Sequence, residues 1–340
     1  MTKIAKAPSR KNDSFVRIGV KKHQLSPFHI LNNFTKRELT YALIKKAPSF
    51  PLVFQIQTVD CCNGSCIMCP NSIMTKKKPC AMTDQLYQKI IHEIVTESKG
   101  SFLFLFLQNE PLLDRMIAKK IRHAKNQGGN FQTYFITNGS LCTSEVVREL
   151  VEADLDLIAF SVDGLTKETY ERIRPSFQYD AIMENLEGAL RSQLNVCIKF
   201  TLQKENEKEL KAFRKYWRER QVPVDINVVS NRTGCLPNYD EIFVPPPYSS
   251  IKKTIGKAYL KLVKCCPQIL TTFNILSNGD VILCCDDFSR TMVLGNMTDT
   301  SIKEIWNGEQ YQEIRRLFHQ GRSKEIPLCR SCSKREAGLE

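Results

Sequence analysis

The feature of this sequence that most constrains its fold is a loop with four cysteines in nine residues, which directly follows a short apolar run. Three of them, Cys62, Cys66 and Cys69, have the spacing C-x3-C-x2-C, and Gly64 allows the loop between them to curl tightly. Three thiolates from one short loop suit an iron–sulfur cluster that keeps one iron free of protein ligands. Disulfides or a zinc knuckle are the alternatives, although zinc loops typically have the spacing C-x2-C or C-x4-C.

The cysteine content indicates metal or redox chemistry. The chain has 14 cysteines and a basic, polar N-terminus without the apolar segment of an export signal. No stretch approaches the roughly 18 apolar residues of a membrane span. We therefore expect a cytoplasmic protein, in which thiols stay reduced. The cysteines gather in two groups, over residues 61–69 and 265–332, so we expect two metal centres.

The formal charge of +13 is compatible with a nucleic-acid or acidic partner, but Lys and Arg are spread along the chain. Solvated faces of a basic protein are therefore the simplest interpretation, and a phosphate-bearing or acidic substrate is the next. A zinc-stabilised nucleic-acid-binding protein is the non-enzymatic alternative.

Short apolar runs alternate with longer amphipathic stretches in the first two thirds of the chain. The pattern predicts strands over 52–59, 102–107, 131–136, 157–162, 195–202 and 224–229, and helices over 84–96, 113–125, 144–151, 181–191 and 205–219. Such βα repeats predict an α/β fold with a parallel sheet, closed into a partial (β/α)6 or complete barrel, with an open doubly wound sheet as the alternative. Working loops follow the strands of such barrels, so the cysteine loop is expected at the active-site mouth.

We expect four segments along the chain: a basic N-terminal extension (1–50), the barrel (51–230), a linker (231–255) and a C-terminal module (256–340). A helix is expected over residues 36–46 of the extension.

The C-terminal module is expected to begin with a β-hairpin over residues 273–283, with Asn278-Gly279 at the turn. Helices are expected over 301–306 and 310–318. The C-terminal module is expected to end in a knuckle formed by Cys329 and Cys332.

In the order of these motifs the chain resembles the radical S-adenosylmethionine (SAM) superfamily, over about residues 52–335. In that family the amino and carboxylate groups of SAM chelate the open iron of a [4Fe-4S] cluster. The resemblance therefore implies that Cys62, Cys66 and Cys69 hold this cluster, with Cys61 as a packed neighbour.

Further matches imply a SAM pocket. Gln108-Asn109-Glu110-Pro111 stands where the family has Gly-Gly-Glu-Pro, so Asn109 and Glu110 are expected at the SAM ammonium, although both glycines are replaced. Arg174 stands where an arginine commonly meets the SAM carboxylate, which suits its planar guanidinium. The other expected SAM-binding residues lie at the ends of the third and fourth strands and are Asn138, Ser161 and Asp163.

The C-terminal module resembles the SPASM/twitch branch, whose signature begins C-x(9–15)-G-x4-C. Cys266, Gly279 and Cys284 satisfy this signature, and Cys329 and Cys332 close it. The resemblance implies one auxiliary [4Fe-4S] cluster with four thiolate ligands. Alternatives are Cys265 in place of Cys266, and zinc in place of the cluster; Cys285 would break the x4 step.

The resemblance implies that the reduced cluster cleaves SAM to a 5′-deoxyadenosyl radical. A fully ligated auxiliary cluster suits an electron acceptor, so we expect dehydrogenation of a small polar alcohol of the cyclitol or aminosugar type. An external one-electron reductant such as flavodoxin or ferredoxin is implied. The alternatives are a maturase of a ribosomal peptide and a radical epimerase with Cys235 as hydrogen donor. The sequence does not identify the base.

Overall fold

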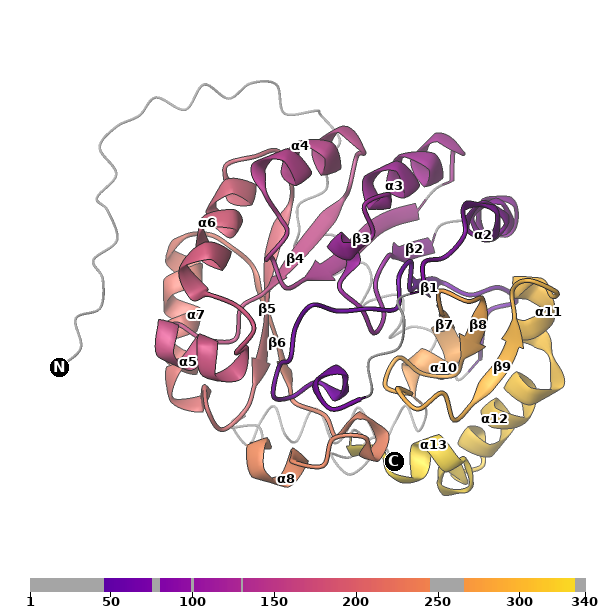
Figure 1. Cartoon of the computed structure of the whole chain (residues 1–340). Coiled ribbons are helices and arrows are strands. Elements are labelled where there is room, and N and C mark those ends of the chain that lie inside the picture. Colours follow the sequence, from indigo (N-terminus) through magenta and orange to yellow (C-terminus); the bar gives the residue numbers. More distant parts are fainter. Residues whose placement is uncertain (1–45, 75–79, 99–100, 130, 245–265, 334–340) are drawn as a thin grey trace.

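The computed structural model describes residues 46–74, 80–98, 101–129, 131–244 and 266–333 (Figure 1). The helix expected over residues 36–46 falls almost entirely outside the described residues, and Cys265 lies outside them as well. No helix in the described ranges is long and apolar enough to cross a membrane.

The core of the fold is a curved sheet of six parallel strands in the order β6-β5-β4-β3-β2-β1. The strands are β1 (Val53–Ile56), β2 (Ser101–Phe104), β3 (Phe131–Thr137), β4 (Leu157–Ser161), β5 (Val196–Leu202) and β6 (Val224–Val228). Each strand is paired with the next one in the chain, which requires a crossover between them. The predicted partial barrel is thus confirmed.

The crossover helices cover the outer face of this sheet (Figure 1). They are α2 (Asp84–Glu97), α3 (Ile117–Asn126), α4 (Ser144–Glu152), α5 (Lys167–Ile173), α6 (Tyr179–Leu190) and α7 (Leu210–Glu219). Thr83, Thr143 and Thr166 cap α2, α4 and α5 by accepting a hydrogen bond from a backbone N–H of the first turn. Helix α5 was not predicted, because seven residues give too little periodicity to recognise.

Single 3-10 turns occur in the loops between these elements. They are η1 (Pro70–Ser72), η2 (Pro111–Leu113), η3 (Glu207–Glu209), η4 (Arg232–Gly234) and η5 (Ser323–Glu325). Two of them lie next to predicted motifs: η1 follows the cysteine loop, and η2 begins directly after Glu110.

The C-terminal module continues the barrel sheet. Strand β7 (Thr272–Ile275) pairs in parallel with β1, and β8 (Asp280–Ile282) and β9 (Val293–Asn296) follow antiparallel. The predicted hairpin is therefore present, with Gly279 at a φ of +90° in its turn; β9 was not predicted. The remaining helices are α8 (Tyr239–Ile242), α10 (Pro267–Thr271), α11 (Ile302–Asn307), α12 (Glu309–His319) and α13 (Pro327–Arg330).

Aromatic packing joins the module to the barrel. The Phe54 ring on β1 meets the Phe273 ring on β7 edge to face at 6.2 Å, and Phe273 in turn contacts Trp306 and Tyr311. The Arg315 guanidinium lies 4.0 Å from the centre of the Trp306 ring. This packing holds the second cysteine group against the barrel.

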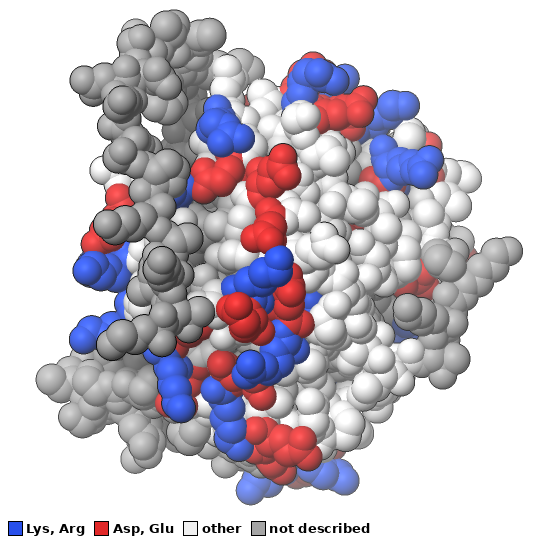
Figure 2. All heavy atoms as spheres, turned by 60° about the vertical axis from the view of Figure 1, so that its left-hand side comes forward, with Lys and Arg blue, Asp and Glu red and all other residues white. Residues whose placement is uncertain are grey.

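Charges of both signs are interleaved on the face shown in Figure 2. Among the exposed ion pairs of the described residues, Lys167 pairs with Asp180 at 2.6 Å, and Lys215 pairs with Glu219 at 3.9 Å. The interpretation of the basic composition as solvated, paired faces is consistent with this surface.

Candidate active site

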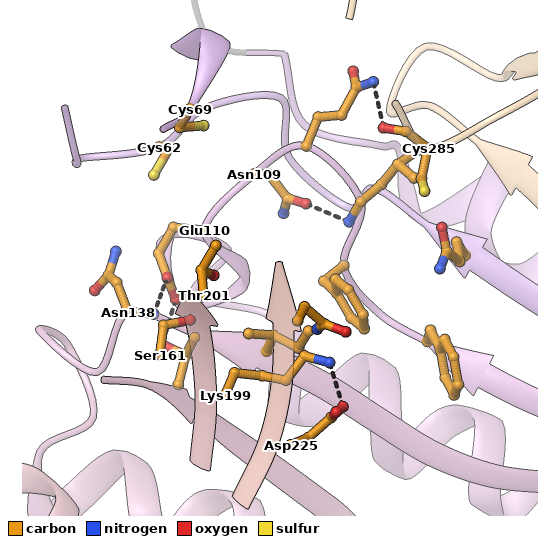
Figure 3. A pocket seen from close by; sticks show the side chains of 18 of the residues that line it. Cys62, Cys69, Asn109, Glu110, Asn138, Ser161, Lys199, Thr201, Asp225 and Cys285 are labelled. Carbon is orange, nitrogen blue, oxygen red and sulfur yellow. Dashed lines mark hydrogen bonds and ion pairs between the residues drawn. The ribbon is translucent and has the colours of Figure 1, made fainter. Parts of the chain in front are cut away.

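A cavity of about 910 Å³ lies at the carboxyl ends of the barrel strands and extends between them. The cysteine loop, all six barrel strands or the loops that follow them, and the C-terminal module contribute to its wall. The predicted site residues that line it are Cys62, Cys66, Cys69, Asn109, Glu110, Asn138, Ser161 and Arg174. In Figure 3, the cysteine loop lies on the opposite side of the cavity from Lys199 and Asp225.

Six predicted site residues are not part of this wall: Asp163, Cys235 and the four cysteines expected at the auxiliary cluster, Cys266, Cys284, Cys329 and Cys332. Asp163 is fully buried, and Cys235 lies in the loop after β6, with its Sγ 3.1 Å from Ser289 Oγ. The structure thus brings Asp163 to the cavity only through its neighbours and does not bring Cys235 there.

The cysteine loop presents its thiols to hydrogen-bond donors. The Gly64 N–H lies 3.4 Å from Cys62 Sγ, and Arg174 Nη1 lies 3.5 Å from Cys66 Sγ. A Cβ on Gly64 would stand 2.9 Å from the Phe177 ring, so a larger residue there would require the ring to shift. Burial raises the pKa of Cys62 to about 12 and also raises the pKa of Cys66. Thiols in such a setting ionise when a metal is bound, and these donors then stabilise the sulfur charge.

Arg174 is held by Asp163. Its Nε and Nη2 donate to Asp163 Oδ2 at 2.7 and 2.6 Å, while Asp163 Oδ1 accepts from the Thr201 N–H at 2.6 Å. Burial alone would lower the pKa of Arg174, but the Asp163 and Cys66 charges raise it above its usual value. The guanidinium is therefore a fixed cation beside the cysteine loop.

Glu110 is a buried carboxylate at the cavity wall, exposed by only 2%. Its Oε1 accepts from Thr137 Oγ1 at 2.7 Å and from the Leu112 N–H at 3.1 Å, and its Oε2 accepts from the Asn138 N–H at 2.7 Å. Burial raises the pKa of Glu110, and these three donors offset part of that rise. A cation that reached this carboxylate would favour its charged form.

The motif Gln108-Asn109 needs no glycine here, because neither residue has a positive φ. Asn109 Oδ1 accepts from the Leu107 N–H at 3.0 Å, but its Nδ2 is buried without a hydrogen-bond partner in the described part of the chain. A buried donor of this kind on a cavity wall fits a ligand with an acceptor oxygen or nitrogen. The residues present therefore fit a SAM-sized polar cofactor.

The second cysteine group lies where the module meets the barrel. Cys266 directly precedes α10 as its N-cap residue, Cys284 follows β8, and Cys329 belongs to α13. The Asp286 N–H lies 3.4 Å from Cys284 Sγ, and the Cys332 N–H bonds Cys329 O at 3.3 Å. No three His, Cys, Asp or Glu side chains of the described ranges are placed to hold one metal ion; a [4Fe-4S] cluster distributes its ligands over four irons.

The loop Asn231–Gly234, called here the 231–234 loop, bonds to both parts of this cysteine group. Asn231 Nδ2 donates to Ser331 O at 2.6 Å, beside Cys332, and Arg232 Nη1 pairs with Asp286 Oδ1 at 2.6 Å, beside Cys284. The loop thus holds the Cys329–Cys332 knuckle and the Cys284 loop next to each other. Arg232 also lines the cavity.

The cysteine after Cys284 reaches the cavity. Cys285 lines it, and Gln108 Nε2 donates to Cys285 O at 3.1 Å (Figure 3). The two cysteine groups therefore border the same cavity, and Gln108, which replaces a family glycine, connects them.

Sequence reasoning missed several polar residues inside the barrel. Lys199 on β5 and Asp225 on β6 are register partners that form an ion pair on the cavity wall, and Gln55 on β1 also lines it. The available signal was the charge itself: Lys199 interrupts an otherwise apolar strand.

Comparison with known proteins gives two matching family models. The model of the Radical SAM superfamily matches residues 56–216, and that of the SPASM iron–sulfur cluster-binding domain matches residues 265–333. A curated relative is the S-adenosyl-L-methionine-dependent 2-deoxy-scyllo-inosamine dehydrogenase of Niallia circulans, which is 21% identical over 283 residues, or 83% of this chain and 92% of the relative.

Two solved structures are similar in fold. BtrN in complex with AdoMet and 2-DOIA has a TM-score of 0.57 and 18% identity, over 83% of this chain and 92% of its own. Streptococcus suis SuiB bound to the precursor peptide SuiA has a TM-score of 0.63 and 13% identity, over 91% of this chain and 75% of its own.

Proposed function

Because the chain belongs to the radical SAM superfamily and carries a SPASM domain, we propose that it is a dehydrogenase that oxidises a small polar alcohol of the cyclitol or aminosugar type. Membership makes it an iron–sulfur enzyme that uses SAM, a [4Fe-4S] cluster and an auxiliary iron–sulfur cluster. The substrate class comes from the relative that dehydrogenates 2-deoxy-scyllo-inosamine and aligns over 92% of its own length.

We assign the SAM-binding cluster to Cys62, Cys66 and Cys69, whose thiols line one cavity. The auxiliary cluster is assigned to the C-terminal group, composed of Cys266, Cys284, Cys329 and Cys332. When bound, the first cluster would supply the electron that cleaves SAM to a 5′-deoxyadenosyl radical, and the auxiliary cluster would accept the second electron of the oxidation.

The protein's own residues hold the reactants. Glu110 offers its buried carboxylate to the SAM ammonium, and Asn109 Nδ2 offers a donor that has no partner among the described residues. Arg174, fixed by Asp163, supplies positive charge at Cys66. Aromatic side chains of β2, its following loop and β3, namely Phe104, Phe106 and Tyr134, line the part of the cavity inside the barrel.

The observation that carries the proposal is the shared cavity. Cys285, the neighbour of Cys284, lines the same cavity as the first cysteine group, so an electron acceptor held by Cys284 would lie beside a substrate in that cavity. A dehydrogenase requires this arrangement, because the second electron must leave the substrate after hydrogen abstraction. Cys235 is not on this wall, which favours dehydrogenation over the epimerase alternative.

Anaerobic reconstitution tests the proposal. The reconstituted protein is incubated with SAM, dithionite and 2-deoxy-scyllo-inosamine or scyllo-inositol, and 5′-deoxyadenosine and products are followed by mass spectrometry. A dehydrogenase forms a product two hydrogens lighter than the alcohol. A product isomeric with the substrate would instead indicate an epimerase, and the absence of conversion of both alcohols would refute the proposed substrate class.

A peptide is the second candidate substrate. The similarity of fold to SuiB, whose structure contains a precursor peptide, is the observation that favours it. Peptides encoded beside this gene, added in place of the alcohols, would then stimulate 5′-deoxyadenosine formation and change in mass.

A further inference from the structure

A charged pair lies inside the barrel, where apolar side chains usually fill the space. Lys199 Nζ contacts Asp225 Oδ2 across the neighbouring strands β5 and β6, and Figure 3 shows both side chains on the cavity wall. The Lys199 and Asp225 side chains are 20% and 36% exposed, so the pair faces the cavity and is not sealed in the core. Burying two charges has a desolvation cost, and stability alone does not explain them at this position.

An unpaired acceptor faces the same cavity from the other end of the parallel sheet. Gln55, on β1, is only 9% exposed, and its Oε1 has no hydrogen-bond partner in the part of the chain that the structure describes. Buried polar atoms are nearly always hydrogen-bonded, so this oxygen indicates a ligand that brings a donor. Asp225 bonds Lys199 through Oδ2, and its Oδ1 accepts no hydrogen bond within the described ranges, so it can accept one from a ligand.

Aromatic rings connect these polar groups. Gln55, Phe104 and Tyr134 are successive register partners across β1, β2 and β3. Phe104 meets Tyr134 at 5.0 Å between ring centres, and Phe106 meets Tyr134 at 5.4 Å. A small ring with polar groups at its edge would fit such a wall, its carbon face against the aromatic side chains and its edge toward the polar ones.

We propose that Lys199, Asp225 and Gln55 form the substrate-recognition subsite of this enzyme and bind the hydroxyl and amino groups of an aminocyclitol. Asp225 and Gln55 accept hydrogen bonds from these groups, and Lys199 donates to a ring hydroxyl oxygen. The Lys199–Asp225 pair carries no net charge, and the Asp225 carboxylate would repel an anion. A phosphate or carboxylate group on the ligand would therefore be disfavoured. This inference rests on the proposed function and specifies which residues select its substrate.

The test is equilibrium binding, not turnover. Calorimetry measures the dissociation constant of 2-deoxy-scyllo-inosamine for the anaerobically reconstituted protein with SAM present. Asp225→Asn, which retains the shape of the side chain, is expected to weaken binding about tenfold or more, as is typical for loss of a charged hydrogen bond. The double variant Lys199→Met/Asp225→Leu leaves no charge unpaired and is expected to lose binding as well.

Two controls isolate the subsite. Glu219→Gln alters the exposed Lys215–Glu219 pair on α7, far from the cavity wall, and is expected to bind as the wild type does. SAM cleavage without any alcohol is expected to proceed at the wild-type rate in every variant, because the residues assigned to SAM are unchanged.

The outcomes separate the two proposals. If the wild type converts the alcohol and Asp225→Asn binds it equally well, the subsite is wrong and the proposed function stands. If the wild type neither binds nor converts 2-deoxy-scyllo-inosamine, both the subsite and the proposed substrate class are overturned, although SAM cleavage continues.

Discussion

Replacing Glu110 by Gln tests whether its buried carboxylate binds the SAM ammonium. The carboxylate is 2% exposed and accepts three hydrogen bonds, from Thr137 Oγ1, Asn138 N–H and Leu112 N–H. A hydrogen bond to a charged group contributes about 1.5–3 kcal/mol, which corresponds to a roughly 10- to 150-fold change in the dissociation constant. Glutamine also points an NH2 group at one of these donors. We therefore expect SAM binding to weaken at least tenfold.

The assay is equilibrium dialysis of SAM against the anaerobically reconstituted protein. Iron content is measured in parallel and is expected to match the wild type, because Cys62, Cys66 and Cys69 are unchanged. Glu149→Gln, at an exposed position on α4, is the matched control. If Glu110→Gln bound SAM with a wild-type dissociation constant at equal iron content, Glu110 would not be the ammonium partner.

Three further predictions concern the same site. The paired substitution Cys266→Ala/Cys284→Ala is expected to lower the iron content from about eight to about four per chain. The control Cys80→Ala changes an exposed cysteine outside both groups and is expected to leave the iron content unchanged. An unaltered iron content in the paired variant would contradict the auxiliary assignment. Arg232→Met removes the ion pair with the 2% exposed Asp286 side chain, so a lower melting temperature is expected than for Arg322→Met, whose ion pair is exposed. Equal melting temperatures would argue against the role of this pair. Burial raises the pKa of Glu110, so SAM affinity is expected to fall as the pH drops through that raised pKa and the carboxylate becomes neutral. In the SAM-free protein the same group stabilises the fold at low pH, and this contribution is lost as the pH rises. Equilibrium dialysis of SAM and thermal melts, each across a pH series, measure the two trends.

The barrel and most of its mouth were predictable from the sequence because their patterns are local. Apolar runs of strand length separated by helical periodicity specify the order of β1 to β6, and the carboxyl ends of parallel strands necessarily meet at one edge. Glu110 and Asn138 follow β2 and β3, and Ser161 is the last residue of β4, so all three lie on one cavity. Helix α5 and strand β9 were not predicted, because each is too short to show a hydrophobic period.

Side-chain direction was not predictable in the same way. Asp163 belongs to a motif expected to bind SAM, but its carboxylate turns to Arg174 and the Thr201 N–H, so any effect on SAM passes through Arg174. Lys199 and Asp225 are separated by 26 residues, and only the parallel register of β5 and β6 makes them partners. Pairings of this kind depend on tertiary structure, and a single sequence carries no direct signal for them.

The 231–234 loop, which the sequence predicts as the start of a linker, is held by specific contacts and borders the cavity. The sequence predicts a linker from residue 231, yet Arg232 and Thr233 both have positive φ values, 49° and 56°, which non-glycine residues rarely adopt. Contacts offset this strain: Arg232 pairs with Asp286, and Asn231 bonds the chain beside Cys332. The strained conformation places the guanidinium of Arg232 on the cavity wall, near both Cys69 and Cys285. A fixed positive charge there would favour reduction of a cluster held by either cysteine group, while the hydrogen bonds of the loop hold the two parts of the second cysteine group together.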